Sequence, residues 1–520
     1  MVRNTGEAAG PTTQREEPSS PSAIIFGMPA PEESELRQKA ARYFPPWESD
    51  QLPRAPLFGW RHWTALIGPG LLMAGSNIGG GEWLFGPIVT ARYGGQLMWL
   101  ATLSIGFQVF YNLAIMRYTL YTGEPIFVGF FRTAPGPKFW AIFYLFIDLG
   151  GIWPYLWSNA AVPLVAAFLG RLPGPEDDAM VKMAGYGIFL SAFVPLIFGG
   201  KIYNAVERVM VTKIVLVLGY LSFIGVFMVS KETWIDIFSG FLKFGSLPDQ
   251  QVDWATLAAF AAIAGAGGLS NMNFSNYTRD KGWGMGLLVG AIPSMVGGKK
   301  VRLSHVGKVF AISPESLVRW RGWLKHIMRD QIAVWSVGCV LGMALPSMLS
   351  LEFIPGATVE GNAAAAMTAR GIADRYGEIF WFLTLLCGFI VLAPGQISDV
   401  DGIIRRWTDV IWTGSLRVRH MEGHQVKNIY YTIMGAYCVW GLIALRLTPD
   451  PLVLAVVTGT LRNIGLGATA IHALAINRKL LPTELQPGWF MQAGLLGCFV
   501  FFMGITVIAF HQRYMQLMGP

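Results

Sequence analysis

Long apolar stretches alternate with short polar connections through most of this chain. A helix of about 20 apolar residues is long enough to cross the hydrocarbon core of a bilayer. Eleven such spans are predicted, at about 62–90, 94–116, 137–168, 181–200, 206–230, 254–292, 331–350, 374–397, 427–446, 452–476 and 488–510. The pattern therefore predicts an all-α, polytopic membrane protein that is embedded in the lipid bilayer.

Two of these spans are interrupted by glycines. Gly79, Gly80 and Gly81 interrupt the first span, and the segment 265–268 interrupts the sixth. Glycine destabilises a helix, and unwound backbone inside a membrane is tolerated only where it lines a cavity or is buried in protein. The sixth span lies five spans after the first, so the two cross in opposite directions. This pattern indicates two inverted repeats of five helices, with a transport site where the broken helices meet.

One acid follows the first break directly. Glu82 comes after the three glycines and lies near the middle of the first span. A charged group at this depth is unfavourable by a few kcal/mol or more and usually marks the path of a substrate or ion. We therefore predict that Glu82 contacts the substrate.

The distribution of charge predicts the orientation of the chain. The net charge is +8, and Lys and Arg gather before the first span and between the sixth and seventh. The positive-inside rule then predicts an N-terminus in the cytoplasm and a C-terminus outside, and we expect the cell (inner) membrane as the location. This asymmetry accounts for the charge without a nucleic-acid partner. We expect a disordered cytoplasmic tail over 1–58, a transporter domain over 59–515, and within it a basic amphipathic cytoplasmic connector over 293–330.

Several short motifs follow one another in the order of a known family. They are Gly68-Pro69-Gly70, Tyr93-Gly94-Gly95 followed by Trp99, Arg117 with Thr122-Gly123, Asp148-Leu149, and Pro394-Gly395-Gln396. In this order and spacing the chain resembles the Nramp (natural resistance-associated macrophage protein) family of metal transporters. The resemblance implies the LeuT-type five-plus-five inverted repeat with discontinuous helices 1 and 6, an added eleventh helix, and secondary transport by alternating access.

The chain departs from this family at the metal site. Where Nramp transporters hold a transition metal with Asp-Pro-Gly-Asn in the first helix, Gly79 stands at the Asp and Glu82 at the Asn. Where they have Met-Pro-His in the sixth, this chain has Gly268-Leu269-Ser270. Asp148 keeps an acid of the third helix, but Gly151 replaces its Glu partner. The resemblance thus implies a divergent relative that lacks the Mn/Fe site.

The groups that remain near the two breaks offer oxygen. They are the side chains of Glu82, Asn77, Ser270, Asn271, Asn273 and Gln396 and the backbone of Gly79, Gly80 and Gly81. Carboxylate, amide, hydroxyl and carbonyl oxygens suit hard cations such as Mg²⁺. The first hypothesis is therefore a transporter of a hard metal cation, Mg-like rather than Mn or Fe, with Glu82 as the metal ligand.

Two other functions remain open. Arg462 in the tenth span brings a second charge, which would repel a divalent cation nearby. Its guanidinium could instead clamp an anionic group of the substrate, or pair with Glu82 or Asp148. This favours a small organic solute, an amine or an amino-acid-like compound; a non-transporting relative is the third hypothesis. Asp148 and Arg462 would balance charge or carry protons. No enzyme motif and no cofactor motif is found, and Asp399 and Asp401 before Arg405 and Arg406 indicate a charged interfacial helix end.

Overall fold

The protein is described by a computed structural model that covers residues 31–57, 59, 68–79, 81–198, 202–290, 306–357, 366–415, 417–418, 421, 425–447 and 451–518. Regular structure in these residues is almost entirely helical. Their one sheet pairs two-residue strands in parallel, β1 (Glu48–Ser49) and β2 (Lys308–Val309). The all-α prediction is confirmed.

Eight helical segments of the described chain are long and apolar enough to cross a membrane. They contain α4 (Trp99–Thr122), α8 (Asp178–Ser191) with α9 (Val194–Ile197), α10 (Ile202–Met228), α12 (Trp254–Ile263) with α13 (Asn273–Lys281), α15 (Pro314–Arg329) with α16 (Val337–Phe353), α18 (Glu378–Gly414), α19 (Val426–Leu447) and α21 (Trp489–Met518). The predicted tenth span is α20 (Pro451–Leu480). The molecule is an integral membrane protein.

The first and third spans are each divided into two helices. The first consists of α2 (Pro69–Asn77) and α3 (Gly86–Tyr93), joined by a π-helical turn over Gly81–Phe85. The third, expected to be continuous, is split into α6 (Pro137–Asp148) and α7 (Tyr155–Leu169). Gly150 and Gly151 weaken the helix between them, and Pro154 has no N–H to donate.

Short helices lie in the N-terminal tail and between the long helices. They are α1 (Pro31–Ala41), α5 (Ile126–Phe131), α11 (Lys231–Gly240), α14 (Gly286–Val289) and α17 (Met367–Tyr376). Within the expected connector, α15 passes through a π-helical turn over Asp330–Ser336 into α16, so the two form one long helical segment.

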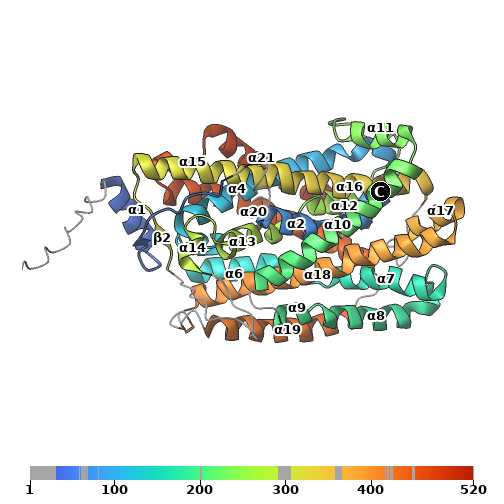
Figure 1. Ribbon diagram of the computed structural model, residues 1–520, viewed down its shortest axis with the longest axis horizontal. Coiled ribbons are helices and arrows are strands. Elements are labelled where there is room, and N and C mark those ends of the chain that lie inside the picture. Colours follow the sequence, from blue (N-terminus) through green and yellow to red (C-terminus); the bar gives the residue numbers. More distant parts are fainter. Residues whose placement is uncertain are drawn as a thin grey trace, which may run out of the picture.

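The long helices run side by side along the longest axis of the molecule (Figure 1). Helix α1 and strand β2 lie at one end, and α11, α17 and the C-terminus lie at the other. The two ends of the described chain are therefore on opposite sides of the helical bundle.

Part of the N-terminal tail is folded onto the bundle. The Arg132 guanidinium donates to the carbonyls of Ala40 and Pro45 at 2.8 and 3.0 Å, and it lies 5.2 and 4.9 Å from the ring centroids of Phe44 and Trp47. These contacts hold the segment after α1 against the end of the bundle. Residues 1–30 of the expected disordered tail lie outside the described residues.

Strand β1 then fixes the end of this segment. Asp50, directly after β1, accepts hydrogen bonds from the backbone N–H of Gln51 at 2.8 Å and from the Lys308 ammonium at 3.0 Å. These two donors hold the pKa of the Asp50 carboxyl below its ordinary value, although partial burial acts in the opposite direction.

Candidate functional site

The break in the first span is built around Glu82. Helix α2 ends at Asn77, and the N–H of Gly79 donates to Glu82 Oε2 at 3.2 Å. The side chain is fully buried, and within the described residues its other oxygen, Oε1, has no hydrogen-bond partner. Gly80, also expected at the site, lies outside the described residues. A buried carboxylate is thus held at the break, with one oxygen that no described residue satisfies.

A buried lysine faces this region from another helix. Lys213 on α10 is 2% exposed, and its Nζ has no hydrogen-bond partner in the described chain. The charges of Glu82 and Asp399 both act on it. A Cβ at Gly395 on α18 would lie 3.1 Å from Nζ and 3.5 Å from the carbonyl oxygen of Ser76. The absence of a side chain at Gly395 therefore leaves room for the ammonium between α2, α10 and α18.

Lys213 was not among the predicted site residues. Its signal was present, because it is the single charged residue in the apolar stretch 209–228. The glycine breaks pointed to the first and sixth spans instead, and hydropathy alone does not show which face of α10 the lysine is on.

The break in the sixth span is stabilised by a glutamine that the sequence analysis also missed. Gln108 on α4 accepts the N–H groups of Ala266 and Gly267 at 3.0 and 3.1 Å and donates to the carbonyl of Ala264 at 2.9 Å. Ser104, one turn earlier on α4, donates to the same carbonyl at 3.0 Å. The unwound backbone thus finds in α4 the partners that a continuous helix would have supplied.

Asn271 belongs to a chain of hydrogen bonds that connects both broken spans. Its amide donates to Asn112 at 2.8 Å, Asn112 donates to Gln331 at 2.9 Å, and Gln331 donates to Asp330 at 2.9 Å. Asp330 then accepts the N–H of Gly70 at 2.9 Å, in the first turn of α2. This predicted site residue is therefore partly used in positioning, although its Oδ1 has no partner in the described chain.

Asp148 and Asn273 lie in a second polar cluster, which is centred on Arg406. The Arg406 guanidinium donates to the two carboxylate oxygens of Asp148 at 2.9 and 3.2 Å and to Asn273 Oδ1 at 3.3 Å. Trp407 Nε1 also donates to Asp148, at 2.9 Å. The carboxylate of Asp148 is thus fully paired, a geometry that suits a structural ion pair.

Ser270 and Arg462 line a separate small cavity between the third, sixth and tenth spans. Its volume is about 10 Å³, and Asp148, Gly150, Gly151 and Leu461 also line it; such a space admits about one water molecule. Arg462 donates to Asp399 at 3.4 Å, whereas the sequence analysis had considered Glu82 or Asp148 as its partner. A cavity of this size does not hold an organic solute.

The last two predicted site residues are Asn77, at the end of α2, and Gln396, which follows Gly395 on α18. The amide of Asn77 lies 3.9 Å from Cys339 Sγ, and the charge of Glu82 acts on that thiol. Gln396 is 3% exposed, and its Oε1 has no partner in the described chain. The candidate site therefore consists of Glu82, Gly79, Lys213, Gln396 and Asn77.

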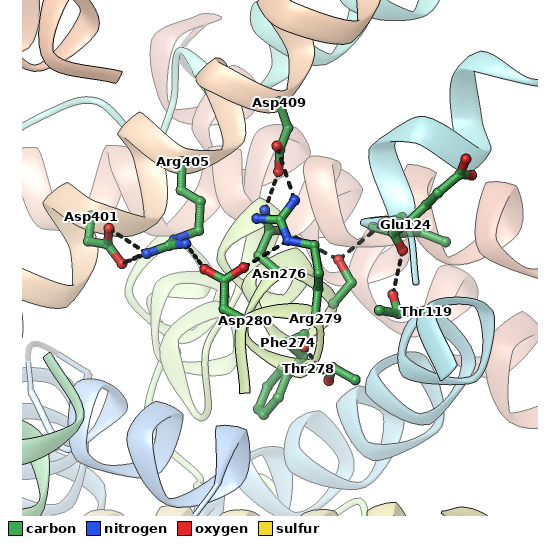
Figure 2. Close-up of polar contacts among 12 residues, drawn as sticks. Thr119, Glu124, Phe274, Asn276, Thr278, Arg279, Asp280, Asp401, Arg405 and Asp409 are labelled. Carbon is green, nitrogen blue, oxygen red and sulfur yellow. Dashed lines mark hydrogen bonds and ion pairs between the residues drawn. The ribbon is translucent and has the colours of Figure 1, made fainter. Parts of the chain in front are cut away.

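The second half of α18 carries buried charges rather than an interfacial helix end. Figure 2 shows Asp280 between the guanidinium groups of Arg279 and Arg405, with Asp401 beside Arg405 and Asp409 beside Arg279. Asp401 and Arg405 are 0% exposed, so the expectation of an interfacial end was wrong for them. Charges of both signs alternate here, and mutual pairing makes their burial tolerable. The network joins α13, the second half of the sixth span, to α18.

The site offers few ligands for a transition metal. No group of three or more His, Cys, Asp or Glu side chains is placed to hold a metal ion within the described residues. Glu82 is accompanied by neutral oxygen atoms and by the Lys213 ammonium.

No protein-family model and no curated protein sequence matches the chain. Several solved structures, however, have a fold similar to that of the chain. Two crystal structures of mutants of the manganese transporter of Eremococcus coleocola are 13% and 12% identical to it, and both have a TM-score of 0.58 over 89% of each chain. A structure of the same transporter in complex with an aromatic bis-isothiourea substituted compound has a TM-score of 0.53, 12% identity and 91% coverage of each chain. The chain therefore has the LeuT-type fold with broken first and sixth helices that the resemblance implied.

Proposed function

We propose that this protein is a secondary transporter that works by alternating access around Glu82 and Lys213. The observation that carries the proposal is a pair of opposite charges buried beside a broken helix, each with a polar atom that no described residue satisfies. Buried polar atoms without partners are rare in folded proteins, because each is unfavourable by about 1–3 kcal/mol. A transported ligand would supply the missing partners.

The same pair favours a substrate that carries both an anionic and a cationic group. A divalent cation bound to Glu82 would be repelled by the nearby ammonium of Lys213. A zwitterionic solute, such as an amino-acid-like compound, places its cationic group on the carboxylate and its anionic group on the ammonium. We propose this substrate class first.

A hard metal cation is the second candidate. Oε1 of Glu82, Oε1 of Gln396 and Oδ1 of Asn271 are buried acceptor oxygens without a donor in the described chain. Oxygen atoms of this kind are the ligands that Mg²⁺ takes, usually together with retained water. In this case the ammonium of Lys213 would have to move or lose its proton when the cation binds.

Thermal-shift titration of the purified protein tests both candidates. Mg²⁺, Mn²⁺ and Ca²⁺ are titrated in parallel with amino acids and amines, because a ligand that binds the folded state raises the melting temperature with its concentration. We expect a shift with an amino acid or a related zwitterion. In Glu82→Gln and in Lys213→Gln, the ligand concentration needed for the same shift in melting temperature should rise by about 10- to 100-fold. Each substitution removes a charge-assisted hydrogen bond to the ligand.

The effect of Lys213→Gln separates the two candidates. If a cation is the substrate, this variant removes a repulsive charge, so Mg²⁺ should bind more tightly while Glu82→Gln abolishes binding. Lys182→Gln, which changes an exposed lysine paired with Asp178, is the matched control. Uptake into proteoliposomes that Glu82→Gln leaves unchanged would contradict the assignment of the site.

A further inference from the structure

A basic cavity opens at the end of the bundle where the tail meets the last spans. Its volume is about 530 Å³, and it lies between α1, the loop before α6 and the end of α20. The charged residues that line it are Glu35, Lys39, Arg42, Arg132, Arg478 and Lys479. Five of these six side chains are basic, so the cavity attracts anions.

Most of this positive charge is free to bind a ligand. Arg132 is paired with Glu124 at 2.5 Å, and Lys39 makes an exposed pair with Glu35 at 3.3 Å. Arg42, Arg478 and Lys479 have no carboxylate partner among the described residues. Two of them are consecutive in the last turn of α20, at the end of a membrane span.

An apolar groove adjoins the basic cavity. Its volume is about 300 Å³, and Trp140, Phe143, Ala468, Ile471 and Ala475 are among the side chains that line it. Thr133, Ala134 and Lys479 line both the cavity and the groove, so the two are continuous.

The groove runs beside an apolar face of α6 that is exposed in the structure. On α6, which provides one wall, Phe139 is 50% exposed, and Ile142 and Phe146 are each 71% exposed. The floor is closed by His472, whose ring nitrogens bond Tyr144 and Thr133 at 2.6 and 2.8 Å and are therefore occupied. The groove thus presents an apolar surface directly beside the basic cavity.

We propose that this cavity and groove together bind one anionic phospholipid. The phosphate of the headgroup lies among Arg42, Arg478 and Lys479, and one acyl chain lies in the groove against Trp140 and Phe143. Basic pockets at the ends of membrane helices bind anionic headgroups in this way, and apolar burial of the chain adds to the affinity. The lipid would join the tail, through α1, to α6 and α20.

The test compares lipids and lipid fragments on the full-length protein in detergent. The probes are phosphatidylglycerol, phosphatidylcholine, glycerophosphoglycerol without acyl chains, and inorganic phosphate. Binding is measured by thermal shift and by native mass spectrometry. We expect phosphatidylglycerol to bind and to raise the melting temperature, and we expect the other three probes to bind at least about tenfold more weakly, because each lacks the charge or the chain.

Two variants separate the contributions of charge and groove. Arg478→Gln combined with Lys479→Gln should weaken phosphatidylglycerol binding by about tenfold or more, since each charge near an anionic surface contributes about 1 kcal/mol. Ala475→Phe keeps every charge and fills the groove, so it should weaken lipid binding without changing the response to inorganic phosphate. Arg370→Gln, which changes an exposed arginine paired with Asp374, is the control.

Three results would overturn the proposal. They are equal binding of phosphatidylcholine, unchanged phosphatidylglycerol binding in the double variant, and a phosphate response that equals the lipid response while Ala475→Phe has no effect. The last result would identify a site for free phosphate rather than for a lipid. Melting temperatures without added lipid show whether each variant is folded.

Discussion

Buried charges in this protein are of two kinds at the scale of single residues. Asp148 meets Arg406 in a two-point ion pair and has Trp407 as a further donor. Glu82 and Lys213 are equally buried, yet each has an atom without a hydrogen-bond partner in the described chain. Paired charges support the fold, whereas incompletely satisfied ones need another partner. This contrast separates the structural role of Asp148 from the binding role proposed for Glu82.

The contrast predicts how two similar substitutions differ. Asp148→Asn leaves the buried charge of Arg406 without its carboxylate, so we expect it to destabilise the protein by about 3–5 kcal/mol. Glu82→Gln removes a charge that lacks a full set of partners and should change stability much less. Melting temperatures in detergent measure both effects.

A double variant provides the control for this prediction. Asp148→Asn combined with Arg406→Gln removes both charges and should recover part of the lost stability, which a double-mutant cycle quantifies. If Asp148→Asn leaves the melting temperature unchanged but shifts the pH dependence of uptake, Asp148 is a proton relay and the structural assignment is wrong.

At the scale of elements, the broken helices depend on partners supplied by unbroken ones. Gly267 and Gly268 have φ of 69° and 62°, which turn the chain away from the helical path and leave N–H and C=O groups free. Gln108 on the continuous helix α4 satisfies three of these groups. The break is therefore a defined structure that keeps its shape because α4 lies beside it.

Removal of Gln108 should loosen the break in the sixth span. Gln108→Ala leaves the N–H groups of Ala266 and Gly267 without these bonds, at about 1–3 kcal/mol for each buried group, whereas the carbonyl of Ala264 keeps its bond from Ser104. We expect a melting temperature several degrees lower, together with faster hydrogen exchange at Ala266 and Gly267. Gln516→Ala, at an exposed position of α21, is the control; equal exchange in both variants would contradict the role of Gln108.

At the scale of the whole molecule, we expect the proposed alternating access to move α13 relative to α18. The charged network of Figure 2 spans these two helices, through Arg405 with Asp280 and Arg279 with Asp409. A network of paired charges holds two elements in one arrangement and releases them when a pair is lost. We therefore expect it to stabilise the arrangement of α13 and α18 that the structure shows.

Loss of Arg405 should favour the separation of α13 from α18. Arg405→Gln leaves Asp280 and Asp401 without the positive charge between them, so their repulsion separates α13 from α18. A cysteine introduced at Ser398, which is 2% exposed, should then react several-fold faster with a membrane-impermeant thiol reagent. Arg370→Gln in the same cysteine background is the comparison, and equal reaction rates would show that the network is not a gate.

The sequence by itself determined the features that depend on local composition. Hydropathy predicted the spans, because a bilayer imposes a minimum apolar length on each crossing. The glycine runs predicted the breaks in the first and sixth spans, because glycine weakens any helix in which it lies. The burial of Glu82 at the first break followed from the same local pattern, and the order of the motifs implied the fold that the solved structures share.

Only the tertiary structure decided which side chains meet. Lys213, which lies near the first break, is 131 positions after Glu82 in the chain, and Asp148 is 258 positions from its partner Arg406, so no periodicity relates the residues of either pair. Whether a buried polar group is paired depends on neighbouring helices, and a sequence read one span at a time does not contain that information. For this reason the predicted oxygen ligands do not form one site in the structure, where they are divided among Glu82, the Arg406 cluster and the hydrogen bonds of Asn271. For the same reason Lys213, which changes the favoured substrate class, was not predicted.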